Sequence, residues 1–331
     1  MSVLNVALIG SEEVARKLGK RGDVRDIESY VHKEERSGET KILSFLRPLR
    51  HPEKIRPFLG VLDVARAGLV EIKKVDAVLG EVLVALGCAG ISHGHAVIAP
   101  EQGEWVDSEQ VRMLLEQAGI GDWEIHEGDV DEHAIRSSLF ELQEHIEDEI
   151  GLLEGGGLVL PVDQHFNVKG VGLVAIGYVQ SGAVSKHDEI VVFPAGELGV
   201  VRSLQVMDDD VERAGAGDRV GVALRNLREQ ALHRGCMICD AGSHALEKTE
   251  SSTFEFKKAP FQKRPLVEGD VVHASSDLQF VVGRVSEVSG SIVSVEWESD
   301  LWLRAGGEAR VMISQLDAPM RIMGIASNFS S

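Results

Sequence analysis

Three consecutive glycines, Gly155-Gly156-Gly157, divide this chain of 331 residues into two parts of different character. Neither a helix nor a strand is expected to run through three glycines, so the segment predicts a linker. Before it, stretches with helical spacing alternate with short apolar runs. After it, short β-type runs separated by Gly and Asp turns recur about every 8–12 residues. The chain is therefore expected to form an α/β part followed by an all-β part, with room for two or three domains.

The N-terminal part predicts an α/β domain with a mostly parallel sheet. Val3–Ile9 is a nearly continuous apolar run, which is typical of a strand buried on both faces. Apolar residues between Asp107 and Gly119 recur at helical spacing, with Ser108 as the expected cap and Gly119 as the stop. Ser137–Leu153 predicts a second helix with one acidic face.

The C-terminal part predicts two small antiparallel β-barrels. Runs such as Glu189–Phe193 and Phe280–Val285 have the length and spacing of barrel strands. The polar stretch 240–252 is poor in apolar residues and is the expected boundary between two sets of strands. The predicted domains are residues 1–155, 156–245 and 246–331.

Motifs in a fixed order within residues 160–235 carry a family resemblance. They are Leu160-Pro161-Val162-Asp163, Phe166 to Gly172, Val174-Ala175-Ile176-Gly177, the sequence AGAGDRVGVALRN at 214–226, and His233-Arg234-Gly235. Together they resemble the second domain of translational GTPases, in which a Phe-containing strand, a Gly-x-Gly turn and an R-A-G-D-x-V-G segment follow one another. A generic β-barrel would explain these residue types but not their order.

The resemblance implies the three-domain architecture of elongation factor Tu and SelB, with a GTP-binding α/β domain followed by two β-barrels. Leu18–Tyr30 is similar to a segment of the pyrrolysine-associated branch of archaeal SelB-like factors. Ala318–Ile325 is similar to the closing strand of the family's third domain, where an Arg and a Gly recur.

The positions at which this family binds GTP hold unsuitable residues in this chain. A phosphate-binding loop requires the pattern G-x-x-x-x-G-K-[ST], and two acidic residues within the loop would repel phosphate. Counted from Gly10, its last three places hold Ala15, Arg16 and Lys17. The sequence RPLR at 47–50 replaces the expected Asp-x-x-Gly, and PEQG at 100–103 replaces the expected Asn-Lys-x-Asp. The sequence therefore predicts that GTP and magnesium are not bound and that the protein is not a GTPase.

The resemblance also implies a site for the aminoacyl end of tRNA, which in family members lies against the second domain. The matching positions here are Asp163, His165, Phe166, Val174 and Arg219. Phe166 and Val174 are expected to form core or pocket wall. Arg219 is an always-charged donor suited to reading a carboxyl or phosphate group. The alternative is a surface arginine paired with Asp218 or Asp163.

The densest basic cluster of the chain falls in the third domain, which contacts the tRNA stem in this family. It consists of Lys257, Lys258, Lys263 and Arg264 around Pro260-Phe261. Basic side chains beside an aromatic ring suit binding to an RNA backbone. A charged edge loop without a ligand is the alternative.

The charge of the chain restricts its partners. A formal net charge of −19 argues against indiscriminate nucleic-acid binding, so no DNA partner is expected. Residues 1–156 hold 17 Lys and Arg against 30 Asp and Glu, which makes the N-terminal domain an alternative protein-binding surface. No apolar stretch is long enough to span a membrane. Three cysteines do not make a disulfide framework, so a cytoplasmic protein is expected.

No metal site is predicted. Cys236 and Cys239 lack two further ligands at suitable spacing and are expected to be core residues. Cys88, His93 and His95 do not form a convincing ligand set either. His126, with Glu124 and Glu127, is expected to lie in an exposed polar loop.

Three functions remain open at this point. The first is a nucleotide-independent binder of tRNA or the ribosome, monomeric and acting as a specialised or regulatory translation factor. The second is a protein-interaction module that does not bind RNA, which the acidic N-terminal domain favours. The third is a divergent elongation factor that still binds GTP through non-standard contacts.

Overall fold

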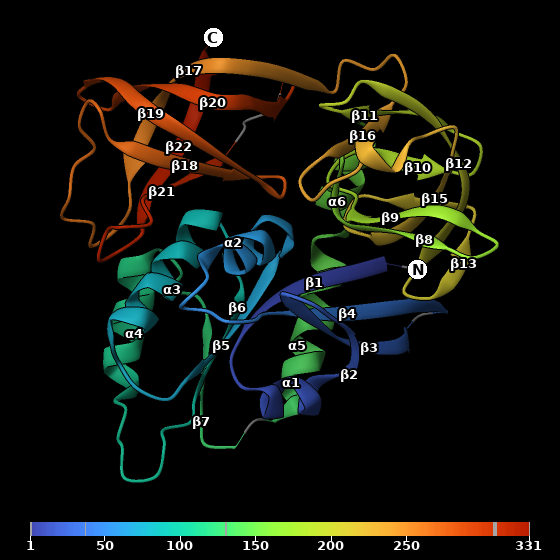
Figure 1. Ribbon diagram of the computed structural model, residues 1–331. Helices are drawn as coiled ribbons and strands as arrows, with labels where there is room; N and C mark the ends of the chain where they lie inside the picture. The colour runs from blue at the N-terminus through green and yellow to red at the C-terminus, as the bar shows by residue number, and fades with distance from the viewer. Residues whose placement is uncertain (1, 37, 130, 307–309, 331) are drawn as a thin grey trace.

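The computed structural model describes residues 2–36, 38–129, 131–306 and 310–330, which form three domains (Figure 1). An α/β domain fills the lower part of the view, and two β-barrels stand side by side above it. Within these ranges no helix is long and apolar enough to cross a membrane. The predicted fold class, an α/β domain followed by two small antiparallel barrels, is confirmed.

The N-terminal domain is built on a seven-stranded sheet of order β2-β3-β4-β1-β5-β6-β7. Strands β4, β1, β5, β6 and β7 run parallel, while β2 and β3 form an antiparallel extension at one edge. The predicted first strand is β1, which is buried almost throughout. The strands are β1 (Ser2–Ile9), β2 (Lys20–Val24), β3 (Ile27–Arg36), β4 (Glu39–Pro48), β5 (Ala67–Ile72), β6 (Gly94–Ile98) and β7 (Glu124–Glu127).

Helices cover both faces of this sheet. The apolar faces of α2, α3 and α4 form one buried cluster with the sheet, and those of α1 and α5 form another on the opposite face. The helices are α1 (Glu12–Leu18), α2 (Ile55–Val64), α3 (Ala77–Ala89), α4 (Ser108–Ala118), α5 (Glu132–His145) and α6 (Glu147–Glu154).

The helix expected over Ser137–Leu153 is in fact two helices, because Ile146 between α5 and α6 leaves the helical conformation with φ −93° and ψ 2°. The apolar spacing continues through Ile146, so the pattern does not mark the break. The break directs α6 towards the middle barrel, where Glu154 accepts a hydrogen bond from Arg213 Nη2 at 2.6 Å.

Two further expectations for this domain need correction. Asp107, not Ser108, caps α4, since its carboxylate accepts from the backbone N–H of Glu109 at 3.0 Å. Gly119 ends the helix in the left-handed conformation, with φ 81°, as expected of a glycine at this position. Residues 124–127, expected in a loop, are strand β7, because they pair in parallel with β6.

The two barrels are each closed by six strands. In the middle barrel the order β11-β16-β8-β9-β15-β12 returns to β11 through β11–β12 pairing, and β13, β10 and β14 lie outside this ring. The middle strands are β8 (Leu160–Val168), β9 (Gly172–Tyr178), β10 (Ala183–Ser185), β11 (Glu189–Phe193), β12 (Glu197–Val206), β13 (Asp209–Val211), β14 (Arg213–Gly215), β15 (Arg219–Arg225) and β16 (Met237–Asp240), with a short 3₁₀ helix at Glu229–Ala231.

The third domain is a closed barrel of order β17-β20-β19-β18-β21-β22. Its first strand begins inside the polar stretch 240–252 that was expected to be only a boundary. Glu247, Lys248, Glu250 and Ser251 are exposed there, so this part of the strand needs few apolar residues. The strands are β17 (Leu246–Lys258), β18 (Val271–Ser276), β19 (Gln279–Ser289), β20 (Ile292–Arg304), β21 (Val311–Ser314) and β22 (Ile322–Ser330).

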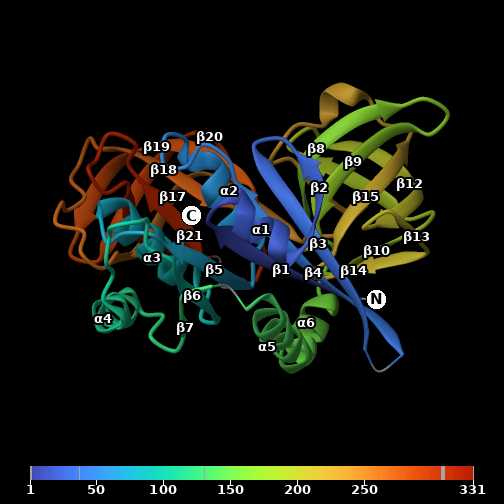
Figure 2. The same ribbon diagram turned by 90° about the horizontal axis from the view of Figure 1, so that it is seen from below.

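Polar contacts connect the N-terminal domain to both barrels. In Figure 2, seen from below, β2 and β3 reach to the middle barrel, where Arg234 Nη1 forms an ion pair with Asp26. Asn5 Nδ2 donates to the Gly217 carbonyl at 2.9 Å. On the other side, Asp63 of α2 accepts from the Leu278 backbone N–H at 3.1 Å. The N-terminal domain therefore touches both barrels through specific hydrogen bonds.

A buried ion pair joins the third barrel to α3. Glu81 accepts from the backbone N–H of Arg321 at 2.8 Å, from its Nε at 3.2 Å and from its Nη2. Arg321 Nη1 also donates to the Pro52 carbonyl at 2.7 Å. The side chains are only 16% and 7% exposed for Arg321 and Glu81. Water therefore screens this pair much less than a surface pair.

Candidate functional site

The loop between β1 and α1 occupies the place of a phosphate-binding loop. Ser11 caps α1 by accepting from the backbone N–H of Val14 at 3.3 Å. The backbone N–H of Ser11 itself donates to the Glu71 carboxylate at 2.5 Å. Glu71 comes from the neighbouring strand β5. A Cβ added at Gly10 would lie 3.0 Å from the Cβ of Glu71. An internal carboxylate thus lies against the backbone where a phosphate-binding loop presents N–H groups to its ligand.

Ala15, Arg16 and Lys17, which follow this loop, lie on α1. Ala15 is fully buried in the apolar cluster beneath α1. Arg16 pairs with Glu12 at 2.5 Å, and Lys17 with Glu13 at 3.4 Å, each one helical turn apart. These cations neutralise the acidic residues of their own helix, which is the ordinary role of such pairs.

Arg47, near the end of β4, is a second contact to the loop. Its Nε donates to the Gly10 carbonyl at 2.7 Å and its Nη1 pairs with Glu28 at 2.7 Å. A cleft of about 510 Å³ opens beside it, at the carboxyl ends of β1, β4 and β5. Arg50, Lys73 and Lys74 line this cleft. The cleft lies at the edge where open α/β sheets bind ligands.

A second cavity, of about 300 Å³, lies between the N-terminal domain and the middle barrel. Phe166 and Arg219 of the predicted aminoacyl site both line it, together with Asp23 of β2. Arg219 Nη2 pairs with Asp23 at 3.3 Å, and Gln164 Nε2 donates to the same carboxylate at 2.8 Å. Burial acts to raise the pKa of Asp23, but the hydrogen bond from Gln164 and the charge of Arg219 hold it below its usual value.

Arg219 is therefore neither on the surface nor paired with Asp218. Asp218 accepts from the backbone N–H of Gly215 at 3.0 Å, so its carboxylate is satisfied inside its own turn. Arg219 Nε is buried and has no hydrogen-bond partner within the ranges that the structure describes. This arginine keeps one unused donor next to the cavity.

The other predicted members of the aminoacyl site lie around this cavity but do not line it. Val174 pairs directly with Phe166 across β8 and β9, so the two side chains share one face of the sheet. His165 pairs with Ala175, which lies in the barrel core, and so is on the opposite face from Phe166. Asp163 is buried, with Arg234 Nε at 3.5 Å from its carboxylate.

The basic cluster of the third domain is exposed. Lys257, Lys258 and Lys263 form no ion pair with any residue that the structure describes. Arg264 pairs with Asp270 at 3.0 Å. Phe261 between them has a half-exposed side chain. The three lysines and the ring of Phe261 are therefore all exposed on this barrel.

The three cysteines are buried, and none of them belongs to a candidate metal-binding group among the described residues. Cys236 and Cys239, three residues apart around β16, belong to different apolar clusters on opposite faces of the sheet. Burial raises the pKa of the Cys236 thiol to about 11 and that of Cys239 to about 12. Both are neutral thiols at physiological pH, as expected of core residues.

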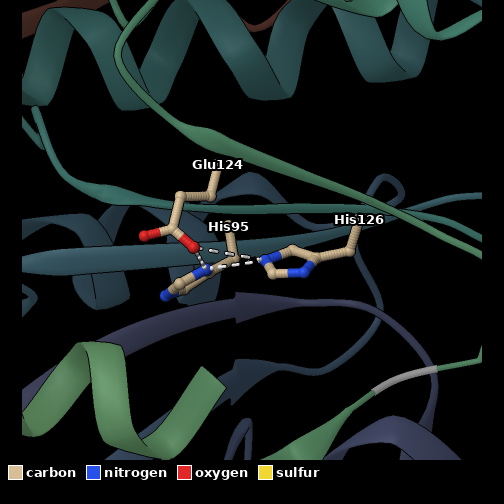
Figure 3. Close-up of side chains that lie close together, drawn as sticks. All are labelled: His95, Glu124 and His126. Atoms are coloured by element: carbon tan, nitrogen blue, oxygen red, sulfur yellow. Dashed lines mark hydrogen bonds and ion pairs between the residues drawn. The ribbon is translucent and has the colours of Figure 1, made fainter. Parts of the chain in front are cut away.

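One cluster was missed from the sequence. His95 of β6 lies beside Glu124 and His126 of β7, with His95 Nδ1 and His126 Nε2 separated by 3.0 Å (Figure 3). Burial lowers the pKa of His95 to about 4. His95 lies 29 residues before Glu124 and 31 before His126, and they meet only because β6 and β7 pair in parallel. No local sequence pattern predicts which residues of the two strands lie side by side.

Comparison with known proteins places this architecture in a family. Residues 172–239 match the family Elongation factor Tu domain 2. The chain superimposes on translation elongation factor SelB from Methanococcus maripaludis in complex with the GTP analogue GppNHp, with a TM-score of 0.80 and 20% identity, covering 100% of this chain and 80% of that one. The chain therefore has the three-domain fold of SelB, and its middle barrel belongs to the family of elongation factor Tu domain 2.

The relatives of this protein match it over very different lengths. It is 32% identical over 326 residues to MJ0325, an uncharacterized protein of Methanocaldococcus jannaschii, covering 98% of this chain and 99% of that protein. It is 40% identical over 81 residues to the selenocysteine-specific elongation factor of the same organism. That match covers 24% of this chain and 17% of the elongation factor. The elongation-factor match therefore falls on one domain, whereas the uncharacterized relative shares the whole chain.

Proposed function

We propose that this protein is a translation factor that binds tRNA or the ribosome through its two β-barrels, without cycling between GTP and GDP. One observation carries the proposal: Glu71 accepts from the Ser11 backbone N–H at 2.5 Å, in the loop where the family holds phosphate. A phosphate in that place would have to displace this carboxylate or lie against its negative charge. A factor without nucleotide-timed release suits a specialised or regulatory role.

The barrels supply surfaces for RNA. Lys257, Lys258 and Lys263 face solvent without ion pairs inside the described ranges, so their charges are free to contact phosphates. Arg219 lines the cavity beside Phe166, and its permanent positive charge suits the aminoacyl end of a tRNA. Since the protein as a whole is strongly acidic, such binding depends on these local surfaces.

Titrations of nucleotide and RNA at one defined salt concentration test both parts of this proposal. Fluorescent GTP and GDP analogues are expected to show no binding at micromolar concentrations. Charged tRNA, uncharged tRNA and ribosomal subunits are then titrated separately, and binding to at least one is expected. Micromolar nucleotide affinity would contradict the nucleotide-free mechanism, and absence of RNA binding at low salt would contradict the RNA-binding part.

Charge reversal locates the RNA surface. Lys257→Glu combined with Lys258→Glu is expected to weaken RNA binding and to reduce the slope of log K against log salt by about 2, one for each phosphate contact removed. Lys20→Glu with Lys54→Glu changes the total charge equally on exposed residues of the N-terminal domain and serves as the control. Equal effects of the two double variants would show that only net charge matters and would remove the cluster from the proposal.

A second candidate function rests on the exposed acidic surface of α5 and α6. Glu141, Glu144, Glu147, Asp148 and Glu149 are all exposed, and Leu152 beside them is an exposed apolar side chain. A basic protein partner would fit this surface. Binding of such a partner, with no RNA binding at low salt, would favour this function over the first.

A further inference from the structure

We propose that His95, Glu124 and His126 form a binding site for a divalent transition-metal ion of the zinc class. Figure 3 shows the three side chains pointing towards one another from two neighbouring strands. His95 Nδ1 lies 3.0 Å from His126 Nε2 and 3.6 Å from Glu124 Oε2, and the last two atoms are 3.8 Å apart. No nucleotide or RNA contact is involved, so the inference is independent of the proposed function.

These separations match the size of a zinc coordination sphere. A circle through the three donor atoms has a radius of about 2.0 Å, as calculated from the three distances. Zinc binds imidazole nitrogen at about 2.0–2.1 Å and carboxylate oxygen at about 2.0–2.2 Å. An ion close to the plane of the three atoms would therefore reach all of them without movement of the backbone.

The donor set selects the class of ion. Two imidazole nitrogens with one carboxylate oxygen suit zinc and its neighbours in the first transition row, whereas magnesium and calcium prefer oxygen ligands throughout. A neutral imidazole has a lone pair on one ring nitrogen, which can bind such an ion. The competing explanation is a direct hydrogen bond between the two imidazoles, which would hold them 3.0 Å apart without an ion.

Neighbouring elements hold the ligands in place. The second carboxylate oxygen of Glu124, Oε1, accepts from Ser138 Oγ of α5 at 3.0 Å, which fixes the orientation of the oxygen that faces the histidines. Parallel pairing sets His95 beside Glu124 and Val97 beside His126. Such supporting contacts are typical of metal ligands, where they fix the direction of each donor atom.

The site is accessible from one side. The side chain of His95 is 3% exposed, but those of His126 and Glu124 are 22% and 57% exposed. An ion can therefore enter from the side of the edge strand β7, and water can complete a four-coordinate sphere. A bound ion would join β7 to β6, and through Ser138 to α5, so we infer a site that stabilises this edge of the sheet.

The test measures metal binding by the full-length protein. Co²⁺ is titrated and followed by its visible absorption, and Zn²⁺ affinity is measured by competition with a chromophoric chelator. We expect one tight site in the wild type, a loss of 100-fold or more in His126→Ala, and a loss of about 10-fold in Ser138→Ala, whose hydroxyl only supports a ligand. His93→Ala, which removes an exposed histidine near β6, is expected to bind as tightly as the wild type.

Thermal unfolding distinguishes loss of a ligand from loss of fold. Without metal, His126→Ala and the wild type are expected to melt at similar temperatures. With saturating Zn²⁺, only the wild type and His93→Ala are expected to gain stability, because an ion that binds the folded state raises its melting temperature. Equal affinity in the wild type and His126→Ala, or an equal loss in His93→Ala, would overturn the proposal and leave the imidazole–imidazole hydrogen bond as the explanation.

Discussion

The ion pair between Arg321 and Glu81 is predicted to be a major contribution to the attachment of the third barrel to the N-terminal domain. The perturbation is Glu81→Gln, which keeps the shape of the side chain but removes its charge. Three donors of Arg321 point to this carboxylate, and the guanidinium is only 16% exposed. The variant thus leaves a buried cation whose partner is neutral.

The magnitude follows from this burial. Removing one partner of a buried ion pair costs about 3–5 kcal/mol, since the remaining charge is left without compensation. The partial exposure of Arg321 allows some rescue by water, which places the expected loss near the lower limit, at about 3 kcal/mol. Glu197→Gln is the matched control, because Arg228 contacts Glu197 with the same groups but is 78% exposed. The control is expected to leave the unfolding midpoint unchanged.

A double-mutant cycle measures the effect. Glu81→Gln, Arg321→Met and the double variant are unfolded in urea, with tryptophan fluorescence as the signal, and the coupling energy is taken from the four free energies of unfolding. Limited proteolysis reports separately whether the third barrel has become detached. A coupling energy below about 1 kcal/mol, which is the range of surface pairs, would refute the reasoning that burial makes this contact strong.

Three further predictions follow from other contacts. Burial raises the pKa of Asp63 to about 7, so the folded protein should lose at most about 4 kcal/mol of stability as pH rises from about 4 to about 7. Urea titrations at pH 5 and pH 8 should show this loss in the wild type but not in Asp63→Asn. Gly68→Ala should destabilise the protein by about 1–3 kcal/mol and change its near-ultraviolet circular dichroism, because the new Cβ would lie 2.2 Å from the Trp123 ring. Arg219→Ala should reduce the preference for charged over uncharged tRNA in the RNA titration, while Arg202→Ala, on the exposed side of the same barrel, should leave it unchanged.

The sign of the Asp63 prediction depends on which state binds the proton. Between the unfolded pKa near 3.8 and the folded pKa near 7, the folded state holds a proton that the unfolded state has released. Stability therefore falls as pH rises through this interval and stays constant above it. A free energy of unfolding that rises between pH 5 and pH 8, and a similar rise in Asp63→Asn, would contradict the assigned burial of this carboxyl group.

The barrels were predictable because their determinants are local. Alternating apolar residues and turn glycines recur every few residues, and the order of motifs between residues 160 and 235 carries the family resemblance in the sequence itself. The glycine in the closing strand at Ala318–Ile325 has a physical cause as well. A Cβ at Gly324 would lie 2.2 Å from the Lys257 carbonyl oxygen, so this position of β22 requires glycine.

The charged contacts were not predictable, because they join distant parts of the chain. Glu71 and Ser11 are 60 residues apart, and Arg219 and Asp23 are 196 apart. The sequence predicts Asp218 or Asp163 as the partner of Arg219, whereas Asp23 is the partner and Asp218 accepts from the backbone N–H of Gly215. Parallel pairing hides contacts in the same way, since the crossover between two parallel strands separates their residues in sequence.

The hydrogen bond from Ser11 to Glu71 has a consequence that concerns competition. The Glu71 carboxylate belongs to the same chain, so it faces the loop in every folded molecule, whatever the protein concentration. It is never diluted and never released, so a free anion has to outcompete a ligand that is always present. On the proposed function, such a protein needs no nucleotide-exchange factor. Its total activity in the cell would then be set by its abundance.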